Sequence, residues 1–137
     1  MTYKFLEHTA DVKFQAEGET LEQAFISSFS ALKETICGDI KILEQEEKNI
    51  NIKSENLENL LYKFLEEFLF FLDSEDFLVN SIKNIEINQE AFELKAVIAG
   101  DKAENYKFTN DVKAITYNNL FVKQEDNKWV VQVVLDV

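Results

Sequence analysis

Apolar and polar residues at the start of the chain first alternate and then recur at the spacing of a helix. Residues 12–17 alternate with a period of two, which predicts a strand, and residues 3–7 form an extended segment before it. After Thr20 the apolar positions fall three and four residues apart until Gly38, and Thr20 and Gln23 have the spacing of a capping box. The pattern therefore predicts two strands followed by an amphipathic helix that buries one face.

The next segment mixes extended and helical patterns. Residues 40–52 are typical of strands but contain the polar run 44–49, so we expect a hairpin with a charged tip. Ser54 then caps a second predicted helix, in which apolar positions over residues 57–72 recur at helical spacing. Because residues 68–72 are all apolar, this end of the helix should lie between two layers of the fold.

The chain after Asp76 contains strand patterns and no further helix. The predicted strands cover residues 77–87, 92–99, 112–122 and 129–137, with turns at 88–90 and 125–127. Parallel pairing would need helices between successive strands, so antiparallel pairing is favoured. The sequence has no proline and three glycines, and nothing in it resembles a linker. We therefore expect a single α+β domain over residues 1–137, with two core helices packed against a largely antiparallel sheet.

Charge narrows the classes of partner. The chain has 26 acidic and 14 basic residues, a net charge of −12, and all of its basic residues are lysines. Nucleic-acid affinity comes largely from cationic contacts to phosphates, so direct binding of RNA or DNA is disfavoured. No stretch approaches the length of a membrane span, and we expect a cytoplasmic protein with no membrane contact.

The inventory of reactive residues excludes most catalytic sites. Cys37 and His8 are the only residues of their types, which rules out a disulfide within the chain and zinc sites built from cysteine and histidine. Cys37 ends a helical apolar pattern and is expected to be buried and inert. The common phosphate-binding, zinc-protease and serine-hydrolase motifs are absent. Any bound metal must therefore take oxygen ligands.

Two aspartates are the strongest candidates for such ligands. The last strand is apolar on both faces, so we expect it to be central, and Asp136 lies near its end beside the terminal residue Val137. A carboxylate on a central strand is costly unless it is paired, protonated or bound to a cation. If Asp11 converged there, the oxygen donors of Asp11, Asp136 and Val137 would suit Ca²⁺, Mg²⁺ or Mn²⁺.

The pattern alone leaves simpler interpretations open for each candidate. Asp136 also fits a solvated strand end, and Asp11 a turn or capping residue. His8 fits a structural, hydrogen-bonded histidine, Glu67 the wet side of a helix, and Lys113 an exposed strand lysine.

Several short blocks in order along nearly the whole chain resemble the archease family. They are His8-Thr9-Ala10-Asp11-Val12, Gly18-Glu19-Thr20-Leu21-Glu22-Gln23-Ala24-Phe25, Leu65-Glu66-Glu67-Phe68-Leu69-Phe70-Phe71-Leu72-Asp73-Ser74-Glu75, Val112-Lys113-Ala114-Ile115-Thr116-Tyr117 and Val134-Leu135-Asp136-Val137. Two positions depart from the family pattern: Asn118 stands where a histidine is common, and Glu66 where an asparagine is usual.

The resemblance implies a small cytoplasmic protein that serves as cofactor of the RtcB-type 3′-phosphate RNA ligase. Such proteins promote formation of the ligase–guanylate intermediate from GTP and let the ligase turn over repeatedly in tRNA splicing and RNA repair. By this resemblance Asp11, Asp136 and Val137 would hold the metal. His8, Glu67 and Lys113 would support the site. An acidic, arginine-free chain also suits a basic partner, because complementary charge speeds and orients encounter.

Two other classes of function remain as alternatives. One is a chaperone-like modulator of a nucleic-acid-modifying enzyme that uses no metal chemistry, in which case Asp11 and Asp136 would be replaceable. The other is a stand-alone metal-dependent hydrolase with Glu67 or His8 as base, for which the sequence offers few acid or base groups.

Overall fold

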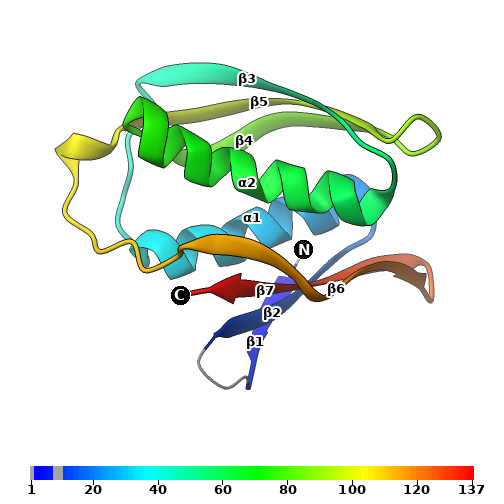
Figure 1. The fold of residues 1–137 in the computed structure, drawn as a ribbon. Coiled ribbons are helices and arrows are strands. Elements are labelled where there is room, and N and C mark those ends of the chain that lie inside the picture. Colours follow the sequence, from blue (N-terminus) through cyan, green and yellow to red (C-terminus); the bar gives the residue numbers. More distant parts are fainter. Residues whose placement is uncertain (1, 8–10) are drawn as a thin grey trace.

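The helices of this protein lie between two β-sheets (Figure 1). The computed structural model describes residues 2–7 and 11–137. Its elements are β1 (Thr2–Leu6), β2 (Val12–Gly18), α1 (Leu21–Cys37), β3 (Glu46–Lys53), α2 (Leu57–Glu75), β4 (Phe77–Asn88), β5 (Glu93–Lys102), a 3₁₀ turn (Ala103–Asn105), β6 (Ala114–Glu125) and β7 (Lys128–Asp136).

Both sheets are antiparallel. The first sheet has the strand order β1-β2-β7-β6, and the second has the order β3-β5-β4. Helix α1 packs mainly on β2 and α2 mainly on β6 and β4, so the core lies between the sheets. The predicted α+β class and antiparallel pairing are confirmed, and the strands are divided between two sheets.

The two ends of α1 follow the sequence prediction. The hydroxyl of Thr20 accepts a hydrogen bond from the Gln23 amide at 3.1 Å, while the Gln23 side chain accepts one from the Glu19 amide at 2.9 Å. The first bond satisfies an amide that the helix start leaves unpaired, and the second pairs the amide just before the N-cap. The helix ends at Gly38, which has a φ of 67°.

Helix α2 begins later than predicted. Its N-cap is Asn56, whose side-chain oxygen accepts from the Asn59 amide at 2.7 Å. Ser54 instead donates its hydroxyl to the Asn56 carbonyl at 2.8 Å, so the prediction of Ser54 as the cap is wrong. The apolar second half of α2 does lie between the sheets as expected, apart from Phe70, which is 52% exposed.

Residues 40–52 do not form the predicted hairpin. The part before β3 is irregular and includes the first two residues of the polar run, 44 and 45, whereas residues 46–49 lie in the edge strand β3, which pairs with β5. Glu44 fixes the irregular part to β4, since its carboxylate accepts hydrogen bonds from Asn80 and Ser81 and pairs with Lys83.

Strand β7 is central in the first sheet, as its two apolar faces predicted. It lies between β2 and β6, and Val131, Val133 and Val134 are fully buried. The β6–β7 turn contains Asp126 and Asn127, both with positive φ, as a tight hairpin turn requires.

Strand β6 carries a wide bulge. Thr116 pairs with Val134 and Phe121 pairs with Gln132, so residues 117–120 on β6 lie opposite the single residue Val133 on β7. The buried Gln132 side chain holds this bulge, because it donates to the Asn119 carbonyl at 2.7 Å and accepts from Gln15 at 2.9 Å. The bulge brings Tyr117 against α2, where its ring stacks on Tyr62 with centroids 4.1 Å apart.

Candidate functional site

Asp136 is the last residue of β7 and its side chain is exposed. It pairs with Ala114 at the start of β6, and its carbonyl accepts a 2.7 Å hydrogen bond from the Lys113 amide. Two residues singled out from the sequence, Asp136 and Lys113, are therefore neighbours across adjacent strands.

Asp11 lies at the same end of the first sheet. Val12 pairs with Leu135, and continuing this antiparallel register by one residue places Asp11 opposite Asp136. Asp11 is half-buried, as is Val137, which follows Asp136. The structure thus brings together the three residues predicted to supply oxygen ligands.

Glu67 and Lys113 share a hollow of about 370 Å³ between α2 and the start of β6. Its lining residues are Lys63, Glu66, Glu67, Leu69, Phe70, Lys113, Ala114 and Ile115. Glu67 is half-buried. Burial is the main cause that raises the pKa of its carboxyl, and the negative charges of Glu66 and Glu75 raise it further.

The oxygen atoms at this end of the sheet could supply only part of the coordination shell of a hard divalent cation. Asp11, Asp136 and an oxygen of Val137 supply oxygen ligands, which Ca²⁺, Mg²⁺ and Mn²⁺ prefer. Among the residues the structure describes, no group of three or more histidine, cysteine, aspartate or glutamate side chains is arranged to hold a metal. Mg²⁺ commonly takes one or two protein carboxylates and keeps several waters, so this set is compatible with such an ion.

Asp136 does not need a cation to offset burial of its carboxylate. We expected a carboxylate on a central strand to be costly, but the Asp136 side chain is exposed because the strand ends there. The neutral interpretation of a solvated strand end agrees with this exposure, and an exposed carboxylate can still be a ligand. His8, the other predicted supporting residue, lies outside the described residues.

Cys37 is buried, as the sequence predicted. Its thiol donates to the Lys33 carbonyl at 3.3 Å, and burial raises the pKa of the thiol. A raised pKa reduces the thiolate fraction and with it the reactivity.

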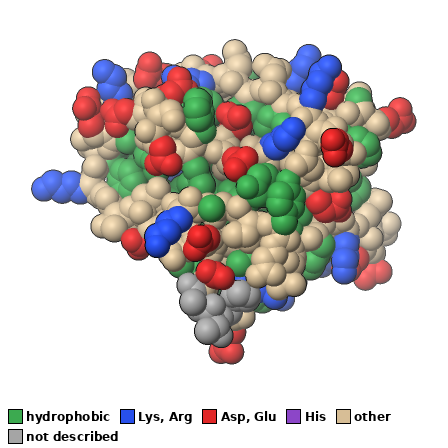
Figure 2. All heavy atoms as spheres, viewed as in Figure 1, with side chains coloured by type: hydrophobic (Ala, Val, Ile, Leu, Met, Phe, Trp, Pro, Cys, Tyr) green, Lys and Arg blue, Asp and Glu red, His purple; other side chains and the backbone are tan. Residues whose placement is uncertain are grey.

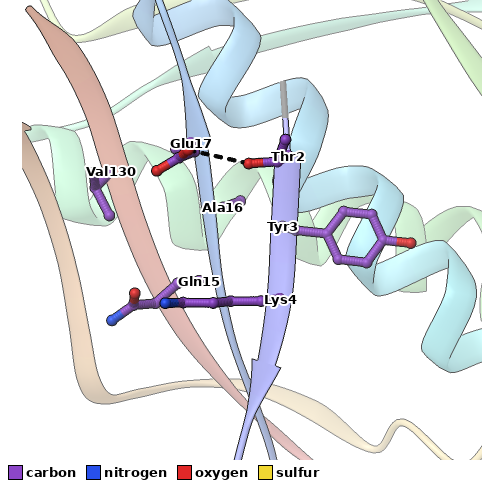
Figure 3. Close-up of a pocket in the computed structure, with 7 residues that line it drawn as sticks. All are labelled: Thr2, Tyr3, Lys4, Gln15, Ala16, Glu17 and Val130. Atoms are coloured by element: carbon purple, nitrogen blue, oxygen red, sulfur yellow. Dashed lines mark hydrogen bonds between the residues drawn. The ribbon is translucent and has the colours of Figure 1, made fainter.

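A smaller hollow of about 140 Å³ lies on the face of the first sheet (Figure 3). Lys4 and Gln15 lie side by side there from paired strands, and the Thr2 hydroxyl donates to Glu17 at 3.2 Å. Glu17 also pairs with Lys128 at 2.9 Å. This hollow includes none of the residues predicted from the sequence, and its carboxylate already has partners.

Sequence reasoning did not single out the exposed aromatic residues beside the larger hollow. Phe70 and Tyr117 are each 52% exposed, and Tyr117 also accepts a hydrogen bond from the Asn59 side chain. Phe70 fell within an unbroken apolar run, where no pattern separates an exposed residue from buried ones.

Comparisons with known proteins agree along the whole chain. The Archease protein family (MTH1598/TM1083) matches residues 3–137. "Protein archease" of Pyrobaculum neutrophilum is 34% identical over 139 residues, covering 98% of this chain and 95% of that protein. "Protein archease" of Pyrococcus abyssi is also 34% identical, covering 98% of both chains.

Solved structures share the fold. The solution structure of protein 1598 from Methanobacterium thermoautotrophicum has a TM-score of 0.83 at 29% identity and 98% coverage of both chains. The crystal structure of a Thermotoga maritima archease, described as a possible chaperone, has a TM-score of 0.68 at 24% identity, covering 98% of this chain and 96% of that one. From the family match and the relatives above 30% identity, this chain belongs to the archease family.

Proposed function

We propose that this protein is an accessory factor of an RtcB-type RNA ligase, and not itself an enzyme. The observation that carries the proposal is the meeting of Asp11, Asp136 and Val137 at one end of the first sheet, beside Lys113. These residues lie at or next to the ends of β2, β7 and β6, and the Asp136 side chain is exposed there.

The proposed role of this end is to present a divalent cation to the partner. Asp11, Asp136 and an oxygen of Val137 would hold Ca²⁺, Mg²⁺ or Mn²⁺, and Lys113, Glu67 and His8 would support the site. When bound, the ion would supply positive charge near the phosphates of GTP in the ligase, where nucleotidyl transfer depends on positioning and charge neutralisation.

Charge supports a protein partner rather than bound RNA. The chain carries a net charge of −12 and no arginine. On the face of the molecule seen in Figure 2, acidic and lysine side chains are interspersed among apolar ones, without a large basic area. We propose that the protein works in the cytoplasm with a basic ligase and reaches RNA only through it. No helix in residues 2–7 and 11–137 is long and apolar enough to cross a membrane.

Replacing Asp136 tests the proposal. With purified ligase from the same organism, GTP, Mg²⁺ or Mn²⁺ and a 3′-phosphate RNA, the wild-type protein should accelerate ligase guanylation and sustain many turnovers. Asp136→Ala should lower this stimulation at least about tenfold, the scale of a lost metal ligand or its support. Asp126→Asn, in the β6–β7 turn, is the matched control and should stimulate like wild type.

Undiminished stimulation by a folded Asp136→Ala variant would contradict the metal-carboxylate role. That result would favour the second candidate, a chaperone-like modulator without metal chemistry, which the description of the Thermotoga maritima relative supports. A loss of stimulation restricted to Asp136→Ala would support the accessory role described above.

A further inference from the structure

The hollow between α2 and β6 has the shape of a groove with an apolar floor. We call it the α2–β6 groove, lined by Lys63, Glu66, Glu67, Leu69, Phe70, Lys113, Ala114 and Ile115. Leu69 and Ile115 are buried at its floor, whereas Phe70 stands half exposed at its side. At about 370 Å³ it is larger than the other hollows described for this protein.

One wall of the groove is a sheet edge. Strand β6 ends the strand order of the first sheet, so one side of its backbone has no neighbouring strand among the residues described. An unpaired edge offers a row of amide and carbonyl groups to an incoming extended chain. Alternate side chains of such a chain would point into the groove and toward α2.

The acidic side chains dominate the charge in the groove. Lys63 is directed elsewhere, because its ammonium donates to the Lys53 carbonyl at 3.0 Å. In the described part of the chain, no ion pair includes Glu66, Glu67 or Lys113. With Lys63 bound to the Lys53 carbonyl, the carboxylates of Glu66 and Glu67 outnumber the single remaining ammonium of Lys113 among the charged side chains that line the groove.

Aromatic rings stand beside these carboxylates. Phe70 lies one helical turn from Glu66, and Tyr62 lies one turn away on the other side, stacked on Tyr117. Rings next to carboxylates are suited to long cationic side chains, whose methylene stems lie on the ring while the charged end meets the carboxylate. Aromatic residues that combine exposure with rigid packing are also frequent energetic centres of protein interfaces.

We propose that the α2–β6 groove receives an extended segment of the partner protein that carries lysine or arginine. The segment adds as a further strand at the β6 edge and places a cationic side chain between Glu66 and Phe70. This inference rests on the proposed function for the identity of the partner, and it adds a docking surface next to the metal-binding end. Because Lys113 belongs to the groove and adjoins Asp136, a segment bound here holds the partner beside that end.

A photo-crosslinking probe tests the location. p-Benzoylphenylalanine replaces Phe70 in one variant and Leu43 in a control, since Leu43 is 59% exposed on the segment before β3. Each variant is irradiated with the ligase and RNA, and the crosslinked residues are then identified by mass spectrometry. The Phe70 probe should crosslink to a lysine- or arginine-containing peptide of the ligase, and the Leu43 probe should not.

Charge reversal tests the chemistry. Glu66→Lys should weaken binding of the ligase about tenfold at low salt, with Glu66→Gln intermediate, and the difference should shrink as salt rises. Glu86→Lys, an exposed position on β4, is the matched control and should bind like wild type. Glu66 and Glu86 are both exposed, so the variants should fold, and circular dichroism checks this.

Each outcome bears on the inference. A crosslink from Phe70 to RNA, equal crosslinking from both probes, or unchanged binding by Glu66→Lys would overturn it. If in those cases the wild-type protein still binds and stimulates the ligase, and Asp136→Ala still lowers that stimulation, only the docking surface is wrong. If the wild-type protein neither binds nor stimulates the ligase, the proposed function fails as well.

Discussion

Glu44 and Glu67 show how neighbouring groups set the behaviour of a carboxylate. Hydrogen bonds from Lys83, Ser81 and Asn80 lower the pKa of Glu44 to about 2. Burial raises the pKa of the Glu67 carboxyl, and the negative charges of Glu66 and Glu75 raise it further. The two residues are indistinguishable by type, and only the folded arrangement separates an ion-paired tether from a carboxylate that gains from an incoming cation.

The Glu44 tether makes stability depend on pH. Its pKa falls from 4.5 to about 2 on folding, so its stabilisation is present above pH 4.5 and is lost as pH falls toward 2. Glu44→Gln should therefore have a lower urea midpoint of unfolding than wild type at pH 6. At pH 2.5 the two midpoints should lie closer together. Glu104→Gln, exposed in the 3₁₀ turn, is the control, and an equal pH effect in that variant would contradict the assignment.

Gly100 is required by close backbone packing. A Cβ atom there would lie 2.1 Å from the Leu78 carbonyl oxygen and 2.9 Å from the Val79 Cα. The adjacent β4 bulge brings this backbone close, and backbone cannot move aside as a flexible side chain can.

We expect Gly100→Ala to lower the free energy of unfolding by about 1–3 kcal/mol, measured by urea denaturation. Gly38→Ala provides the comparison, because open space surrounds a Cβ there and only its φ of 67° opposes the change, at about 1–2 kcal/mol. Relief of the Gly100→Ala defect by shortening Phe77 or another side chain, rather than by backbone change, would contradict this explanation.

At the scale of elements, the sequence predicted helix boundaries that depend on hydrogen bonds between residues close in the chain. The α1 boundaries were correct because the cap and the terminal glycine act within one turn. The predicted hairpin over residues 40–52 was wrong because β3 pairs with β5, across the whole of α2 and β4. Alternation alone does not state which strand is the neighbour.

The start of α2 gives a direct comparison of a predicted and an observed cap. Asn56→Ala removes the acceptor of the Asn59 amide and should cost about 1 kcal/mol of stability. Ser54→Ala removes bonds to the carbonyls of Asn56 and Phe92 but leaves the helix amide paired, so it should cost less. Thermal and urea unfolding of both variants check the order, and a larger loss in Ser54→Ala would restore Ser54 as the functional cap.

At the scale of the molecule, the sequence predicted the class and the central last strand. It also singled out, from the residue pattern and from the family resemblance, residues that the fold does place together: Asp11, Lys113, Asp136 and Val137. The division into two sheets and the α2–β6 groove were not predicted. Both depend on how a helix packs on strands that are distant in sequence. The hydrophobic pattern within one segment does not identify which distant segment it packs against.

The pairing of β2 with β7 gives the metal-binding candidate a property that its residues alone do not have. Val12 and Leu135 are separated by nearly the whole length of the chain, whereas β4 and β5 are joined by a short turn. Closing such a long loop is the entropically costly and slow kind of contact. We therefore expect the pairing that places Asp11 opposite Asp136 to form late in folding, so that a partly folded chain would lack the site proposed at this end of the sheet.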